Sequence, residues 1–250
     1  MLSNKERNLQ MTTLAHQTEY VCRMVFERVG DCSFIGHLDL MHVFERAVRR
    51  ANLPILYSQG YNPKPMMVFA LPLGVGIDTK GDYIDISFER TVPVASAIEE
   101  INKFLPRGIR LLSGVNIDEP KNSLMSVVTA AKYELTIDAA LPEGDSLRAM
   151  LERLTSMDKI LVDKKSKGKI IEVDIKDLIL SLEQNKSSSK STASIYVKAG
   201  SSSNLRPDVL LSALVKYCGL PSEAASNCKV TRLALYGGKY PRLEALDYLV

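Results

Sequence analysis

Apolar residues in the first half of the chain follow two spacings, one typical of strands and the other of helices. Short alternating or strand-rich stretches predict strands over residues 20–28, 66–71, 82–89 and 109–115. Apolar residues three and four positions apart predict helices over residues 36–52 and 94–105. Pro54 and Pro106 follow these helices closely and mark their ends. The elements therefore occur in the order β-α-β-β-α-β.

The second half repeats these spacings, although it shares no obvious sequence identity with the first. Strands are predicted over residues 131–138, 160–163, 169–175, 176–183, 193–199 and 229–236. Helices are predicted over residues 145–157 and 206–218. The order matches the first half apart from one additional hairpin. We therefore predict an α+β protein of two tandem ferredoxin-like (β-α-β-β-α-β) halves, with antiparallel sheets and helices on one face.

Polar and turn-rich segments divide the chain, and its 250 residues are enough for two small domains. The sequence EPKNS at 119–123 has the composition of a connector. We predict a flexible tail over residues 1–19 and a first domain over residues 20–118. A connector over residues 119–130 leads to a second domain with an extra hairpin over residues 131–236, and a C-terminal segment covers residues 237–250.

Composition limits the classes of function. The net charge of +3 is only mildly basic, so the position of the charges matters more than their sum. No apolar run reaches the roughly 18 residues of a membrane helix, and the N-terminal residues lack the apolar core of a signal peptide. We expect a cytoplasmic protein with no membrane contact. The four cysteines lack the spacing of zinc or iron–sulfur sites, so we expect neither metal nor cofactor.

The exposed side of the first predicted helix is basic. Arg46, Arg49 and Arg50 lie three to four residues apart and share this side with His42. Such a face can bind phosphates. It can also be a solvated face whose cations lie near the C-terminal end of the helix, where the helix dipole favours them.

A stiff loop follows over residues 57–65, which we call the tyrosine loop, and it contains two prolines and one glycine. Its candidate ligand-binding residues are Ser58, Gln59, Tyr61, Asn62 and Lys64. A tyrosine ring can stack on an unpaired base, amides can bond its edge, and lysine can meet a phosphate. The alternative is a rigid connector whose Tyr61 packs on its own domain.

Four lysines crowd one predicted hairpin tip in the second half: Lys164, Lys165, Lys167 and Lys169. Lysines that meet phosphates release counterions, so this tip can hold RNA or DNA in a salt-dependent way. The alternative is a soluble turn that resists aggregation at a strand edge.

Two histidines are weak catalytic candidates. His37 begins the first predicted helix next to Asp39, and His42 lies on its basic side. A neutral imidazole at either position could act as a general base. The alternative for His37 is a helix-start residue bonded to the backbone, and no partner set for catalysis is evident.

The stretch GHLDLMHVFERAVRRANLPILYSQGYNPKP, followed by MMVFALPLGVG, resembles the radical-SAM-linked family, a bacterial family of unknown function. Its members are encoded beside radical-SAM proteins or fused to them. The residues that match its pattern are His37, Leu38, Asp39, Arg46, Arg49, Arg50, Ser58, Gln59, Gly60, Asn62, Pro63, Pro65 and Gly74. The sequence departs from that pattern at Gly36, Tyr61 and Lys64.

The resemblance implies a radical-SAM protein as partner but identifies no substrate. The tandem architecture is also similar to that of CRISPR-repeat-processing endoribonucleases, whose glycine-rich C-terminal loop this chain lacks. Fold alone does not determine function.

We therefore expect a non-catalytic RNA-binding adaptor or accessory protein that works with a radical-SAM enzyme, with no evident DNA specificity. One alternative is a protein-only partner of that enzyme, and another is a metal-independent endoribonuclease with a histidine base. The adaptor hypothesis requires that the arginine side of the first helix and the tyrosine loop meet in one basic concave surface.

Overall fold

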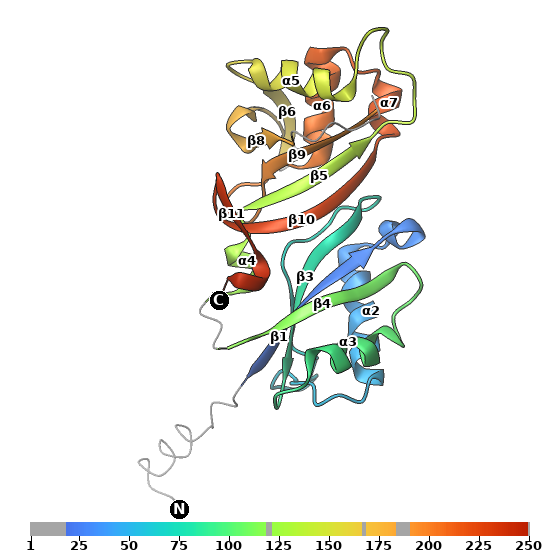
Figure 1. Ribbon diagram of the computed structural model, residues 1–250, viewed down its shortest axis with the longest axis vertical. Helices are drawn as coiled ribbons and strands as arrows, with labels where there is room; N and C mark the ends of the chain where they lie inside the picture. Colours follow the sequence, from blue (N-terminus) through green and yellow to red (C-terminus); the bar gives the residue numbers. More distant parts are fainter. Residues whose placement is uncertain (1–18, 119–121, 167–168, 184–190, 250) are drawn as a thin grey trace, which may run out of the picture.

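The protein, seen in a computed structural model that describes residues 19–118, 122–166, 169–183 and 191–249, is an α+β protein with a large, mostly antiparallel sheet (Figure 1). The main path of this sheet has the strand order β4-β1-β3-β10-β5-β9-β8. Almost all of the predicted tail, part of the predicted connector and the residue Lys167 lie outside the described residues.

The first half supplies one end of the sheet. Its elements are β1 (Tyr20–Arg28), the 3-10 turn η1 (Gly30–Phe34), α2 (His37–Arg50), β2 (Met67–Phe69), β3 (Asp78–Phe88), α3 (Val94–Asn102) and β4 (Ile109–Ile117). Strand β1 pairs with β3 and β4, and β2 pairs with the far part of β3, all antiparallel. The strand order of this half is therefore β4-β1-β3-β2.

The second half supplies the other end. Its elements are α4 (Leu124–Val127), β5 (Ala130–Thr136), α5 (Leu147–Ser156), β6 (Leu161–Ser166), β7 (Lys169–Asp174), η2 (Lys176–Leu178), β8 (Ile179–Leu182), β9 (Thr192–Lys198), α6 (Pro207–Cys218), α7 (Ser222–Ser226), β10 (Lys229–Lys239), β11 (Arg242–Ala245) and η3 (Leu246–Tyr248). The antiparallel order is β10-β5-β9-β8, and β6 and β7 form a separate two-stranded sheet.

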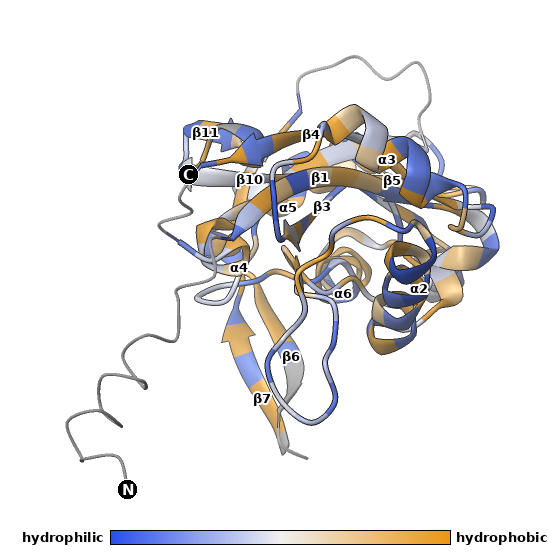
Figure 2. Cartoon of the chain, turned by 90° about the horizontal axis from the view of Figure 1, so that it is seen from below, coloured by the Kyte–Doolittle hydropathy of each residue, from blue (hydrophilic) through white to orange (hydrophobic). Residues whose placement is uncertain are grey.

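Each half has its own apolar core. Phe26, Phe44 and Phe69 pack edge to face in the first half, with ring centroids 5.3–5.7 Å apart. Leucines of α5 and α6 pack against β5 and β9 in the second. Helices α2 and α6 lie on the same side of the sheet, and the hairpin β6–β7 projects on that side (Figure 2).

The two halves share one sheet, whereas the sequence predicted separate ones. A short parallel pairing joins them, with Asp78 opposite Thr231 and Thr79 opposite Arg232. Strand β3 begins at Asp78, four residues before the predicted start, and this extension makes the contact. At Gly81, a Cβ would lie 2.5 Å from the carbonyl oxygen of Leu233. The absence of a side chain therefore lets the two backbones approach.

We predict that Gly81→Ala lowers the free energy of unfolding by about 1–3 kcal/mol, because the new methyl group overpacks the contact between β3 and β10. Urea denaturation followed by circular dichroism measures the change. The control is Lys80→Ala, which alters an exposed neighbour on the same strand and should shift the value by about 0.5 kcal/mol or less. Equal stability of Gly81→Ala and the wild type would contradict the close approach.

Candidate functional site

The outer face of α2 is open to solvent at its C-terminal end. Its apolar residues face the core, with Leu40, Phe44, Ala47 and Val48 buried. Arg46, Arg49 and Arg50 are exposed, and none forms an ion pair within the described part of the chain. Three guanidinium groups are therefore free to meet an anionic partner.

The loop over residues 57–65 is closed at its base and open at its tip. Tyr57 pairs with Pro65 in an isolated bridge. The Ser58 amide donates to the Lys64 carbonyl at 2.9 Å, and the Lys64 amide donates to the Ser58 hydroxyl at 3.0 Å. Tyr61 is fully exposed, so its ring does not pack on its own domain. Gln59 and Asn62 beside it are also exposed.

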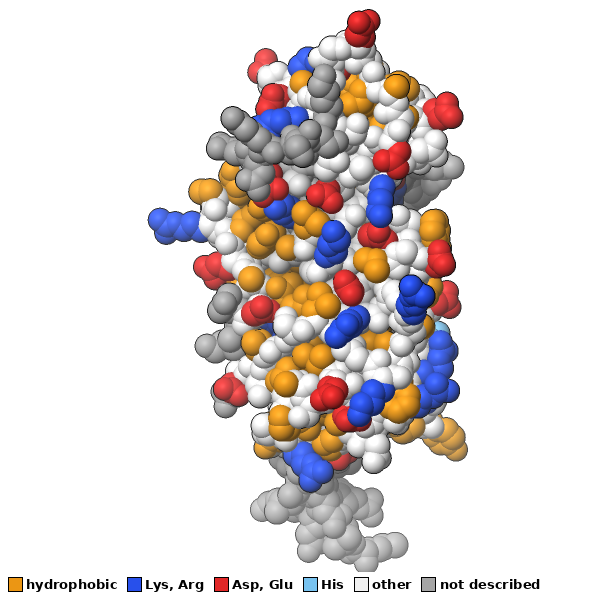
Figure 3. All heavy atoms as spheres, turned by 45° about the vertical axis from the view of Figure 1, so that its right-hand side comes forward, with side chains coloured by type: hydrophobic (Ala, Val, Ile, Leu, Met, Phe, Trp, Pro, Cys, Tyr) orange, Lys and Arg blue, Asp and Glu red, His pale blue; other side chains and the backbone are white. Residues whose placement is uncertain are grey.

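The loop lies against α2. The ammonium group of Lys64 is 4.0 Å from one carboxylate oxygen of Glu45, and Nδ1 of His42 is 3.1 Å from the other. The loop and the helix therefore meet, but an acidic residue stands between their basic groups. Lys and Arg side chains also alternate with Asp and Glu over the face shown in Figure 3. The molecular face in Figure 3 is therefore mixed in charge, whereas the C-terminal half of α2 carries three exposed arginines.

The two histidines lie in different environments. The ring of His37 packs edge to face on Phe69, with centroids 5.5 Å apart. Burial, and to a lesser extent Arg28 and Arg232, lowers the pKa of His37 below its usual 6.5. His42 lies five residues further along α2, about 140° around the helix, and pairs with Glu45. They do not form a joint acid–base pair.

For the hairpin tip with the four lysines, the structure describes part of the backbone only. Lys164 and Lys165 lie on β6 and Lys169 lies on β7, where Ser166 is opposite Lys169. Their side chains, and the whole of Lys167, lie outside the described part of the chain.

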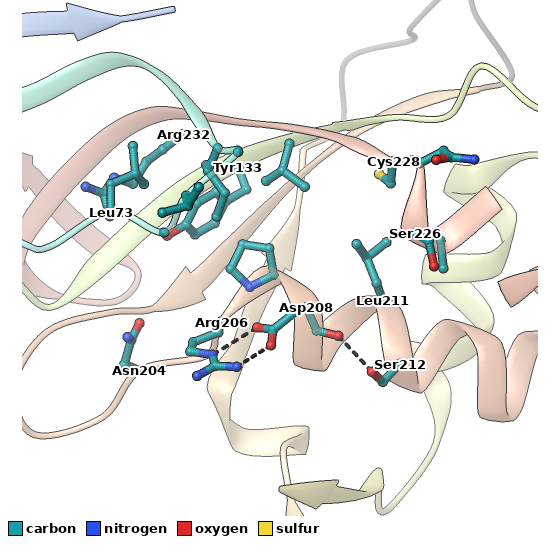
Figure 4. Close-up of a pocket in the computed structure, with 18 of the residues that line it drawn as sticks. Leu73, Tyr133, Asn204, Arg206, Asp208, Leu211, Ser212, Ser226, Cys228 and Arg232 are labelled. Atoms are coloured by element: carbon teal, nitrogen blue, oxygen red, sulfur yellow. Dashed lines mark hydrogen bonds and ion pairs between the residues drawn. The ribbon is translucent and has the colours of Figure 1, made fainter. Parts of the chain in front are cut away.

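A pocket that sequence reasoning did not identify lies at the junction of the two halves. Its volume is about 980 Å³. One wall is the segment 71–77, which we call the glycine loop, together with Phe34 from η1. The opposite wall comes from α6 and α7. Figure 4 shows Leu73 and Tyr133 on one side, and Asp208 and Ser212 on the other.

Two buried arginines hold the glycine loop in place. Arg28, 0% exposed, donates to the carbonyls of Gly74 and Ile77 at 3.0 and 2.9 Å. Arg232, 1% exposed, donates to the Leu71 carbonyl at 2.9 Å and makes two bonds to the Asp82 carboxylate at 2.7 and 2.5 Å. The backbone of the pocket wall is therefore fixed at both ends.

The sequence contained a pattern that could have indicated that Arg28 is buried. It follows Cys22, Met24 and Phe26 at a spacing of two, which places it on the apolar face of β1. A charged residue in such a position needs polar partners from elsewhere in the fold. The sequence could not show that the partners are carbonyls of the glycine loop, which lies more than forty residues away.

Among the described residues that line the pocket, we find neither an activated nucleophile nor an unpaired charge. Burial raises the pKa of the Cys228 thiol to about 11, so it stays protonated at neutral pH. Arg206 and Asp208 pair with each other at the entrance of α6, with Nε 2.9 Å from a carboxylate oxygen. Nowhere in the described part of the chain do three or more His, Cys, Asp or Glu residues gather as metal ligands. These features suit binding better than nucleophilic catalysis.

The fold and these surfaces define a two-part α+β protein with a basic helix face and a pocket at its junction. The chain belongs to the family described as an uncharacterized protein conserved in bacteria (DUF2344), which matches residues 22–207. That range contains α2, the tyrosine loop and the glycine loop. No curated protein matches the sequence. No helix among the described residues is long and apolar enough to cross a membrane.

We predict that the pKa of His37 lies below 6.5, because the partial burial of its ring and the nearby arginines disfavour the imidazolium. The unfolded chain then binds this proton more readily, so His37 lowers stability as the pH falls below about 6.5. NMR titration measures the midpoint, and the spectrum of His37→Gln assigns the signal. A midpoint at or above 6.5 would contradict the buried environment.

Proposed function

We propose that this protein is a non-catalytic RNA-binding accessory protein that works in the cytoplasm with a radical-SAM enzyme. The observation that carries the proposal is the set of three exposed, unpaired arginines on α2 beside a loop whose Tyr61 is fully exposed. Guanidinium groups bind phosphates, and an exposed aromatic ring stacks on an unpaired base. Together they suit a single-stranded segment of RNA.

Glu45, which lies between the arginines of α2 and the tyrosine loop, is compatible with RNA binding at this surface. Both carboxylate oxygens of Glu45 are already engaged, one with His42 and the other near Lys64. Glu45 therefore fixes the loop against the helix and leaves Arg46, Arg49 and Arg50 without an acidic partner. The phosphates of RNA can neutralise these arginines.

The radical-SAM partner is proposed from the resemblance of residues 36–76 to the radical-SAM-linked family. An accessory protein that holds RNA would present it to an enzyme that modifies it. A protein-only role with the same partner is the second candidate, and exposed Phe34 and Leu38, each 70% exposed, favour it because large apolar residues rarely gather in solvent without a partner.

We further infer that the two halves are tandem ferredoxin-like units. The support is that β4-β1-β3-β2 and β10-β5-β9-β8 have the same antiparallel order, with one helix after the first strand and one after the third. In the second half, the hairpin β6–β7 is inserted after α5.

We predict that replacing Arg46, Arg49 and Arg50 together by alanine weakens binding of a labelled mixed-sequence single-stranded RNA. The slope of log affinity against log salt should also fall by roughly 2, because about 0.7 is lost for each phosphate contact on a single strand. Fluorescence anisotropy at several salt concentrations measures both quantities.

The matched control replaces three exposed arginines on other elements, Arg90, Arg107 and Arg110, by alanine. It makes the same change in net charge and should leave more of the affinity and slope intact. Equal losses in the two triple variants would show general charge attraction. If the wild type does not bind RNA, the protein-only role becomes the better candidate.

We predict that Tyr61→Ala weakens RNA binding by about 1–3 kcal/mol, the usual contribution of one stacked base. Tyr61→Phe should bind about as well as the wild type, because phenylalanine keeps the stacking face. The ring is fully exposed, so neither change should affect stability. Equal affinity of Tyr61→Ala and the wild type would exclude stacking at this position.

A further inference from the structure

We propose that the pocket at the junction of the two halves binds a nucleobase. We further infer that it receives one unstacked base of the RNA held on α2, and this second part rests on the proposed function. The pocket, at about 980 Å³, has ample room for a base and its ribose. Its location between two packed halves is also typical of ligand sites.

The wall formed by the glycine loop is preorganised. Arg28 and Arg232 hold the carbonyls of Leu71, Gly74 and Ile77 from beneath, so the loop does not have to become ordered when a ligand binds. Its backbone lies at the pocket surface, because Gly74 and Gly76 carry no side chains there.

An open aromatic ring stands at the edge of this wall. Phe34 lines the pocket and is 70% exposed. A Cβ on Gly76 would lie 3.8 Å from the Phe34 ring, and Gly76 has a φ of +81°, which favours glycine. The exposed part of the ring is available to a flat partner, and stacking on an aromatic side chain is the common way in which proteins hold an unpaired base.

The opposite wall offers neutral hydrogen-bonding groups. The side-chain amides of Asn204 and Asn227 line the pocket and have no partner within the described residues. An amide can donate and accept at once, which matches the edge of a base. Both walls also present apolar side chains, Leu73 from the glycine loop and Leu211 and Val215 from α6.

The charges of the pocket argue against a phosphate inside it. Arg206 is paired with Asp208, and Arg232 is already bonded to Asp82 and Leu71. Cys228 is a neutral thiol at pH 7, because burial raises its pKa to about 11. With its cations engaged, the pocket suits an uncharged heteroaromatic ring better than an anion.

The pocket and the arginines can be reached by one strand. Phe34 lies three residues before the start of α2. Leu38, His42, Glu45 and Arg49 follow at spacings of three and four along the outer side of the helix. From Leu38 to Arg49 the helix rises roughly 17 Å. A short single-stranded segment with phosphates on the arginines could place its end near Phe34.

The test measures binding of free adenosine, guanosine, cytidine and uridine to the full chain by NMR titration. We expect at least one nucleoside to shift signals of pocket residues. Phe34→Ala should weaken its binding by roughly 5- to 150-fold, the equivalent of one stacked ring. Asn227→Ala should alter the order of preference among the four. Phe104→Ala, which removes another partly exposed ring outside the pocket, should change neither the affinity for nucleosides nor the order of preference among them.

Two other outcomes would contradict the proposed base pocket. If no nucleoside binds, or if Phe34→Ala binds as well as the wild type, the base pocket is wrong. If nucleoside monophosphates bind far more tightly than nucleosides, the pocket recognises an anion and the inference fails.

RNA binding of the same variants separates this inference from the proposed function. Loss of RNA binding in the arginine variant with unchanged nucleoside binding would support both. Nucleoside binding without any RNA binding would keep the pocket and overturn the RNA role. RNA binding without nucleoside binding would keep the RNA role and overturn the base pocket.

Discussion

The glycine loop and the pocket beside it depend on two guanidinium groups that are buried near the junction of the two halves. Arg232 binds the Asp82 carboxylate across the junction and also holds a carbonyl of the glycine loop. Arg28 uses its donors on backbone carbonyls alone, and its Nε has no partner within the described residues. Burying a guanidinium costs several kcal/mol unless its donors are satisfied, so the loop and the two strands must stay in this arrangement.

Three consequences follow from this buried pair. The parallel contact between β3 and β10 is held at Asp82, so the halves form one sheet. The glycine loop becomes a fixed wall, which leaves a pocket between itself and α6. The same arginines lie close enough to His37 to lower its pKa, and they favour a neutral ring at the start of α2.

In the function that we propose, the two candidate binding surfaces would make different contributions to RNA binding. Exposed arginines on α2 offer charge without sequence preference, as phosphate contacts do. The pocket offers an aromatic ring that could stack on any base and two side-chain amides that could distinguish one base from another. Helix α2 begins three residues after Phe34, which lines the pocket, and it carries the arginines in its C-terminal half.

The sequence by itself determined the elements, because alternation and helical spacing are local: β1, α2, α6 and the tyrosine loop lie close to their expected positions. It also identified the exposed arginines of α2 as candidates. Tertiary structure alone decided that β3 extends to meet β10 and that Arg28 binds carbonyls far along the chain. It also placed the glycine loop opposite α6. These contacts join residues many positions apart, and the spacing of residues along one segment carries no information about which distant segment it will meet.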